Sequence, residues 1–248
     1  MSHAPEAAIS ASPGLSRVPV EEATRDGEQT WVRRIAGGAL VLGGLLSLVG
    51  FFVRPVAIQK GFSVSDVLAV EGAAGVWVLS FRLLVFGLFV RIAGLVALGS
   101  FSVRPSSRAI IAPGVTISVA ALVISALAQG YHMDIGIHAV WRFQTELTDA
   151  ARQSVLQSFI ATDEWVSCLS RMGVMFLGLG SAFLGGGLAR ETLLPRVVPW
   201  GFAAVGATSM MALFLSPGSH TLFVGAFAVL AASHVAMGAI LLMRKRVA

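Results

Sequence analysis

The sequence has few of the residues from which disulfides and metal clusters are built, because its 248 residues include one cysteine, Cys168. A single cysteine excludes an intramolecular disulfide and a multi-cysteine metal site. Charge is also scarce: 12% of the residues are charged, 56% are hydrophobic, and the mean hydropathy is +0.81. This composition indicates a membrane protein rather than a soluble domain. The net charge of +5 is therefore no sign of nucleic-acid binding, and we expect no nucleic-acid partner.

Acidic residues are missing from every long apolar run of the chain. Proton-coupled carriers commonly place Asp or Glu near the bilayer centre to bind and release the coupling ion. An intramembrane metallohydrolase would need a group of carboxylate or histidine ligands, and a serine hydrolase would show a Gly-x-Ser-x-Gly elbow. The sequence contains neither pattern. These absences argue against an enzyme, and we name no catalytic residue.

Six apolar runs are long enough to cross a bilayer, for which a helix needs about 20 residues. A helix is the expected spanning structure because it satisfies its own backbone hydrogen bonds, and the 27 glycines allow close helix packing. The sequence predicts an all-α, polytopic membrane helical bundle over residues 32–248, preceded by a disordered cytoplasmic tail over residues 1–31. The predicted spans are 31–53, 76–102, 109–131, 166–189, 197–215 and 220–243.

Lys and Arg are distributed unequally between the two sides of this six-span arrangement. The side with both termini carries eleven of them, and the opposite side carries four. Loops rich in Lys and Arg remain in the cytoplasm, so we predict a multi-pass protein of the cell (inner) membrane with both termini cytoplasmic. The eleven are Arg17, Arg25, Arg33, Arg34, Arg104, Arg108, Arg190, Arg196, Arg244, Lys245 and Arg246. The four are Arg54, Lys60, Arg142 and Arg152.

Residues 132–165, between the third and fourth spans, have an apolar stripe at helical spacing and polar residues at other angles. This pattern predicts an outer amphipathic helix that lies on the membrane surface or caps the bundle. We expect membrane lipids around the spans and place a protein partner, if the chain has one, at this outer segment. The stripe consists of Val140, Phe143, Leu147, Ala151, Val155 and Phe159.

Three arginines lie inside predicted spans: Arg82 and Arg91 in the second, and Arg171 in the fourth. A charged side chain in hydrocarbon is costly unless it reaches water or finds partners. Arg82 can extend outward to water, whereas Arg91 is near the middle of its span and needs partners inside the bundle. The candidate side chains are Ser118, Ser125, Gln129 and Ser209. Two alternatives stay open: the arginines lock the bundle, or they form a site for an anion or a lipid headgroup.

Histidines are the other candidates for chemistry. His132 and His138 lie near the outer end of the third span, His220 lies at the outer start of the sixth, and His234 lies within it. His132 or His138 with His220 could supply the axial pair of a b-type haem, while His234 has no histidine partner. The alternative, which we favour, is that these are interfacial histidines plus one that is hydrogen-bonded inside the bundle, without a cofactor.

The end of the fourth predicted span, Gly186-Gly-Leu-Ala-Arg190-Glu-Thr-Leu-Leu-Pro195-Arg196, resembles a group of bacterial six-helix integral membrane proteins that are catalogued as a domain of unknown function. Glu191 and Thr192 depart from the small residues usual in that group. The resemblance implies an architecture and no established activity. The residues that match are Arg190, Leu193, Leu194, Pro195 and Arg196.

Together these patterns favour a non-enzymatic integral membrane protein, an accessory or scaffold subunit of a membrane assembly. One alternative is a lipid- or anion-binding carrier that uses Arg82 and Arg91. The other is a b-type haem electron-transfer subunit that uses His132 or His138 with His220.

Overall fold

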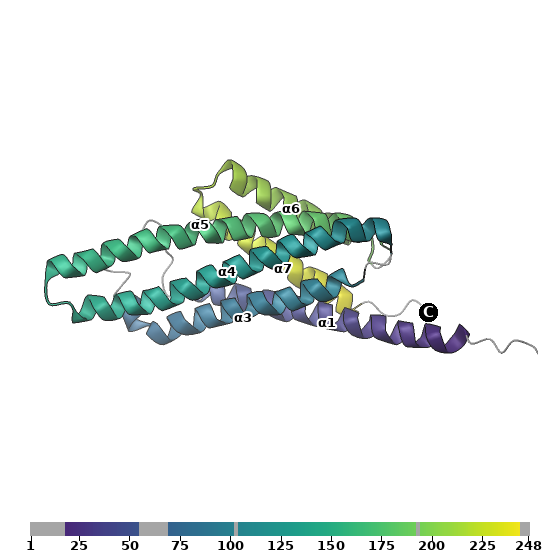
Figure 1. The fold of residues 1–248 in the computed structure, drawn as a ribbon, viewed down its shortest axis with the longest axis horizontal. Coiled ribbons are helices and arrows are strands. Elements are labelled where there is room, and N and C mark those ends of the chain that lie inside the picture. The colour runs from purple at the N-terminus through teal and green to yellow at the C-terminus, as the bar shows by residue number, and fades with distance from the viewer. Residues whose placement is uncertain (1–17, 55–68, 102–103, 192–193, 244–248) are drawn as a thin grey trace, which may run out of the picture.

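The protein is a bundle of long helices (Figure 1). The computed structural model describes residues 18–54, 69–101, 104–191 and 194–243. The helices are α1 (Val18–Phe52), α3 (Ala74–Gly99), α4 (Pro105–Thr145), α5 (Asp149–Leu188), α6 (Val197–Leu215) and α7 (His220–Met243). All six contain a stretch long and apolar enough to cross a membrane. The prediction of an all-α bundle of six spanning helices is confirmed, and each predicted span falls largely within one of these helices.

The first helix begins earlier than expected. α1 starts at Val18, well before the apolar run that opens at Trp31, so it includes part of the segment predicted to be disordered. Extending an existing helix costs far less than starting a new one, which explains how a polar segment can continue a membrane helix. The rest of the predicted tail, residues 1–17, lies outside the described part of the chain.

The outer amphipathic helix predicted over residues 132–165 is not a separate element. Residues 132–145 continue α4 and residues 149–165 continue α5, with a short turn between them that we call the hairpin turn. Thr148 caps α5, because its side-chain oxygen accepts a hydrogen bond from the backbone N–H of Ala151 at 3.2 Å. Each of these helices is about 60 Å long at 1.5 Å per residue, about twice the thickness of the hydrocarbon layer.

Most of the apolar stripe of this segment packs within the protein, whereas Leu147, in the hairpin turn, is exposed. The packed part of the stripe faces the opposite arm of the hairpin and the start of α3, in a cluster that includes Trp77, Val140, Val155 and Phe159. The periodicity thus indicated a helix correctly, and of the two places expected for its apolar face the structure shows packing against the bundle, at the start of α3. An apolar face can be covered by a neighbouring helix as well as by lipid, and the pattern alone does not distinguish the two.

Four exposed Trp and Tyr residues lie near two levels along the bundle, and the exposed Trp141 lies further out on the hairpin. Tyr131 and Trp165 form an edge-to-face pair on α4 and α5, with ring centroids 6.2 Å apart, and both are exposed. Trp31 and Trp200 are exposed near the opposite end. Aromatic residues of this kind gather at membrane interfaces. Residues 132–164 lie beyond the level of Tyr131 and Trp165, in the projecting part of the hairpin (Figure 1).

Glycines set the closest helix contacts. A methyl group added to Gly87 of α3 would lie 2.6 Å from the backbone nitrogen of Ser47 on α1, and one added to Gly37 of α1 would lie 2.8 Å from the carbonyl oxygen of Gly238 on α7. No side chain fits between backbones this close. α1 is therefore held tightly between α3 and α7. The two ends of α1 define the two ends of the bundle: the termini end, and the hairpin end from which α4 and α5 project (Figure 1).

Candidate functional site

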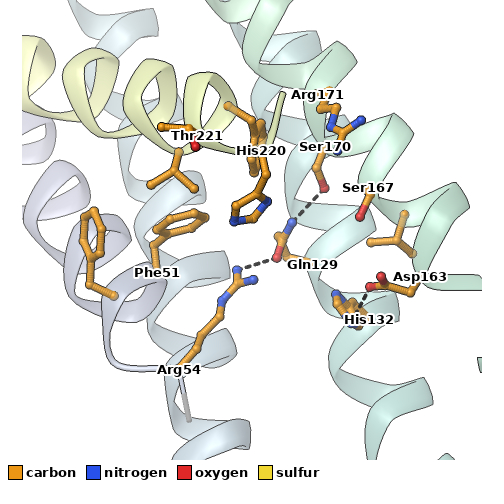
Figure 2. Close-up of a pocket in the computed structure, with 14 residues that line it drawn as sticks. Phe51, Arg54, Gln129, His132, Asp163, Ser167, Ser170, Arg171, His220 and Thr221 are labelled. Atoms are coloured by element: carbon orange, nitrogen blue, oxygen red, sulfur yellow. Dashed lines mark hydrogen bonds and ion pairs between the residues drawn. The ribbon is translucent and has the colours of Figure 1, made fainter. Parts of the chain in front are cut away.

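A pocket of about 360 Å³ lies at the hairpin end, between the end of α1, the start of α7 and the α4–α5 pair (Figure 2). This volume is within the range of small-molecule sites. One part of the lining is apolar and aromatic, and the other part carries charged and hydrogen-bonding side chains. The lining residues are Phe51, Phe52, Arg54, Gln129, His132, Asp163, Val166, Ser167, Ser170, Arg171, His220, Thr221, Phe223 and Val224.

A chain of hydrogen bonds crosses the pocket from α1 to α5. Arg54, just beyond the end of α1, donates from Nη2 to Oε1 of Gln129 at 2.6 Å, and Nε2 of Gln129 donates to Oγ of Ser170 at 2.8 Å (Figure 2). The Arg54 guanidinium also lies over two aromatic rings, 5.0 Å from the centroid of Phe51 and 4.3 Å from that of Phe81. Such cation–π contacts stabilise a partly desolvated cation.

Arg54 keeps its charge in this setting. Burial lowers the pKa of its guanidinium to about 10, and the nearby Asp163 carboxylate opposes that shift. At neutral pH the group is therefore a cation, and its Nε is buried with no hydrogen-bond partner among the described residues. An unmet buried donor beside a cavity is a natural contact for a ligand acceptor.

His132 and Asp163 face each other across the α4–α5 pair. Nε2 of His132 lies 3.2 Å from Oδ1 of Asp163, and both side chains are buried. The orientation does not make a hydrogen bond of good geometry between these two atoms. The imidazole is held between aromatic rings, with centroid distances of 5.5 Å to Trp77 and 5.4 Å to Phe81. This packing fixes the ring, so that Asp163 stands at the edge of the pocket as its acidic member.

Arg171 and His220 stand on the other side of the pocket (Figure 2). Nη1 of Arg171 donates to the carbonyl oxygen of Pro217 at 2.9 Å, which ties α5 to the turn before α7. Among the residues that line the pocket, two guanidinium groups thus stand against one carboxylate, and that carboxylate already faces His132. The pocket carries a net positive charge, which favours an anion.

The structure separates the arginines proposed as one anion site. Arg171 lines the pocket, Arg82 is exposed on α3, and Arg91 is completely buried on the opposite side of the same helix. Nine residues at about 100° each place Arg82 and Arg91 on opposite faces of α3. Arg91 donates from Nη2 to Nδ1 of His234 at 2.8 Å, and not to Gln129, which instead binds Arg54. Arg82 and Arg91 therefore do not share one site in this structure.

The structure also separates the histidines proposed as haem ligands. His132 and His220 line the same pocket, whereas His138 is exposed and lies 2.9 Å from the carbonyl oxygen of Asp134 on its own helix. Nε2 of His132 faces Asp163 rather than open space. Within the described ranges no group of three or more His, Cys, Asp or Glu side chains that could hold a metal ion comes together.

Arg54, Asp163 and Ser170 were not identified from the sequence. Arg54 and Asp163 fall in the two outer connections of the predicted topology, where polar side chains usually face water, and Ser170 falls near the start of the fourth predicted span. Two signals were present: Asp163, Ser167 and Ser170 recur on one face of a helix, and His132 and Asp163 lie at nearly equal distances before and after the hairpin turn. In an antiparallel helix pair, residues at such positions lie at the same level.

Comparisons of this chain with protein families, with curated proteins and with solved structures found no match. The resemblance around Arg190 and Pro195 accordingly stays a prediction. The fold and the pocket define the class: a multi-pass, helical membrane-spanning protein with a cationic pocket at the base of a projecting hairpin.

Proposed function

We propose that this protein is a membrane-embedded binding protein whose pocket takes a small organic monoanion. The observation that supports this is the pocket itself, in which Arg54 and Arg171 face a cavity with a single carboxylate. The carboxylate or phosphate group of the ligand would lie near the two guanidinium groups, and its apolar part would lie against Phe51, Phe223 and Val166. Arg is well suited to both kinds of anionic group because its planar fork can bind two oxygens.

This proposal places the organic anion at the hairpin end and not beside Arg91 in the middle of the bundle. The described residues provide no feature specific to a scaffold or accessory subunit, so that role is not the one we favour. A partner at the projecting hairpin remains a prediction from the sequence. The ligand could be a soluble anion or the headgroup of a membrane lipid, because the two share the same anionic chemistry.

Ligand binding should be visible in the thermal unfolding of the purified protein in mild detergent. Benzoate, which has a carboxylate and an apolar ring, is expected to raise the melting temperature, and the neutral isostere benzamide is not. A ligand at a hundred times its dissociation constant adds about 2.7 kcal/mol to the free energy of unfolding. Short-chain phosphatidylglycerol tests the lipid source in a parallel titration.

Two pocket variants, Arg54→Gln and Arg171→Gln, are expected to lose the stabilisation by whichever probe binds. Arg82→Gln is the matched control, since it removes the same charge at an exposed position outside the pocket and should respond as the wild type does. Equal stabilisation of the wild type and both pocket variants would contradict the proposal. So would the absence of any effect from both probes.

We also propose that the termini end faces the cytoplasm of a bacterial cell, with the protein in the inner membrane. The support is the excess of Lys and Arg on that side of the six spans. A reporter fused after Ala248 is expected to be active only in its cytoplasmic form, and one inserted near Thr148, in the hairpin turn, only in its external form. Activity of both reporters on the same side would contradict both the orientation and the number of crossings.

A further inference from the structure

A second polar centre lies deep in the bundle, away from the pocket. Arg91 on α3 and His234 on α7 are both 0% exposed. Along α3, Arg91 is about 12 Å from the helix end at Gly99 and about 26 Å from its start at Ala74. The guanidinium stays charged in a protein, so a full positive charge sits within the membrane-spanning part of the bundle, where charges are costly.

The described residues supply almost nothing to balance this charge. No carboxylate forms an ion pair with Arg91 in the part of the chain that the structure describes. Its Nη2 lies 2.8 Å from Nδ1 of His234, whereas its Nε and Nη1 are buried without a hydrogen-bond partner. A buried N–H group of a charged side chain that has no hydrogen-bond acceptor costs more free energy than an unmet N–H group of a neutral side chain. Arg91 therefore has donors that need an acceptor.

His234 adds to the surplus of donors. Its Nδ1 lies 2.8 Å from Arg91 and also 2.7 Å from the carbonyl oxygen of Leu230, and one ring nitrogen cannot accept from the first and donate to the second. If Nδ1 accepts from Arg91, the ring proton is on Nε2, which is itself buried and unpartnered. If Nδ1 donates to Leu230, the Arg91 guanidinium loses its one hydrogen bond to the described residues. Either tautomer leaves N–H groups without an acceptor.

The surroundings limit what the missing acceptor can be. A methyl group on Gly43 of α1 would lie 2.7 Å from the backbone nitrogen of Arg91 and 2.8 Å from its Cγ, so α1 closes tightly over the arginine. The ring of Phe202 lies edge-on to His234 at 5.1 Å. A lipid headgroup could not reach a fully buried arginine without separating these helices. The acceptor must be small.

From these contacts we propose that Arg91 binds one small inorganic anion of the halide class inside the bundle, while His234 holds the guanidinium through Nη2. The anion would accept hydrogen bonds from one edge of the guanidinium, either from Nη1 and Nη2 or from Nε and Nη2, because Nε–H and Nη1–H point to different edges. It would also neutralise the guanidinium charge. This site is independent of the hairpin-end pocket, which uses Arg54 and Arg171.

The protein is compared in a chloride salt and in a gluconate salt of the same cation at equal ionic strength. Chloride is the probe, and gluconate is an anion too large to enter the site. The wild type is expected to melt at a higher temperature in chloride than in gluconate and to bind radiolabelled chloride, which bromide displaces. Arg91→Leu should abolish both effects. Arg91→Lys keeps the charge but loses the planar fork, and should weaken chloride binding about tenfold or more because charged hydrogen bonds are lost.

Arg82→Leu is the matched control, because it makes the same change on the same helix at an exposed position; it should retain the chloride effect. Arg54→Gln should retain it too, which separates this site from the pocket. Should Arg91→Leu fail to fold, the direct binding of chloride to the wild type still decides the question. A wild type that binds no chloride and melts equally in both salts overturns the proposal, as does an Arg91→Leu variant with the full chloride effect.

Discussion

Replacing Trp77 with alanine is expected to lower the free energy of unfolding by about 3–5 kcal/mol, the usual cost of removing a buried aromatic side chain. Trp77 is 0% exposed and is the central member of the cluster that joins α3 to the hairpin. Its ring packs against Phe81 at a centroid distance of 4.7 Å and against His132 at 5.5 Å. The indole also fills the space beside Gly136, where an added methyl group would lie 2.7 Å from a ring carbon.

The loss of stability in Trp77→Ala should be greatest in the projecting hairpin, residues 132–165, because Trp77 connects the hairpin to the rest of the bundle. Thermal unfolding measures the total effect, and hydrogen exchange should show faster exchange in the hairpin than in α1 or α7. Trp141→Ala is the matched control, since Trp141 is on the same hairpin and is 61% exposed. If both variants melt at the same temperature, Trp77 does not hold the hairpin as the structure indicates.

Replacing Gly87 with alanine is expected to destabilise the protein at least as strongly as overpacking does elsewhere, about 1–3 kcal/mol. The added methyl group would lie 2.6 Å from the backbone nitrogen of Ser47 and 2.7 Å from the carbonyl oxygen of Gly43. A flexible side chain could move aside, but these are backbone atoms of α1. The two helices would have to separate along their contact surface.

Gly75→Ala makes the same change on the same helix, where the added methyl group meets nothing within 4 Å. It should leave the melting temperature unchanged or slightly raised, because alanine is the better helix former. Each kcal/mol is worth about 2–4 °C in a chain of this size, so the two variants should differ measurably. If the Gly87→Ala and Gly75→Ala proteins have the same melting temperature, α1 and α3 are not in backbone contact.

The two polar centres differ in the way they hold their arginines. Arg54 is stacked on aromatic rings and linked to Gln129, and a carboxylate lies nearby. Arg91 has an imidazole as its single described partner and no carboxylate. The first arrangement leaves a cavity beside a charge that is partly balanced, which suits a ligand that exchanges. The second encloses a charge completely, which suits a small ion that stays bound.

The identity of the neighbours of Arg91 shows where reasoning from the sequence fails. Ser118, Ser125, Gln129 and Ser209 were reasonable donors and acceptors by depth alone, yet Arg91 contacts His234, and Gln129 contacts Arg54. Depth along a helix follows from counting residues, because the rise is constant. The direction in which a side chain points depends on the rotation of each helix against its neighbours.

The amino-acid sequence alone predicts the class of this protein, the positions of its six spans and the helical character of residues 132–165. These properties are local: they depend on the length and apolar character of a run and on the spacing of apolar residues along it. Tertiary structure decided that the hairpin turn brings His132 to Asp163, that Arg54 closes one side of a pocket and that Arg91 meets His234. The residues of each pair are distant along the chain. They meet because the glycine contacts and the apolar clusters fix the rotation of each helix about its axis and its position along the neighbouring helix.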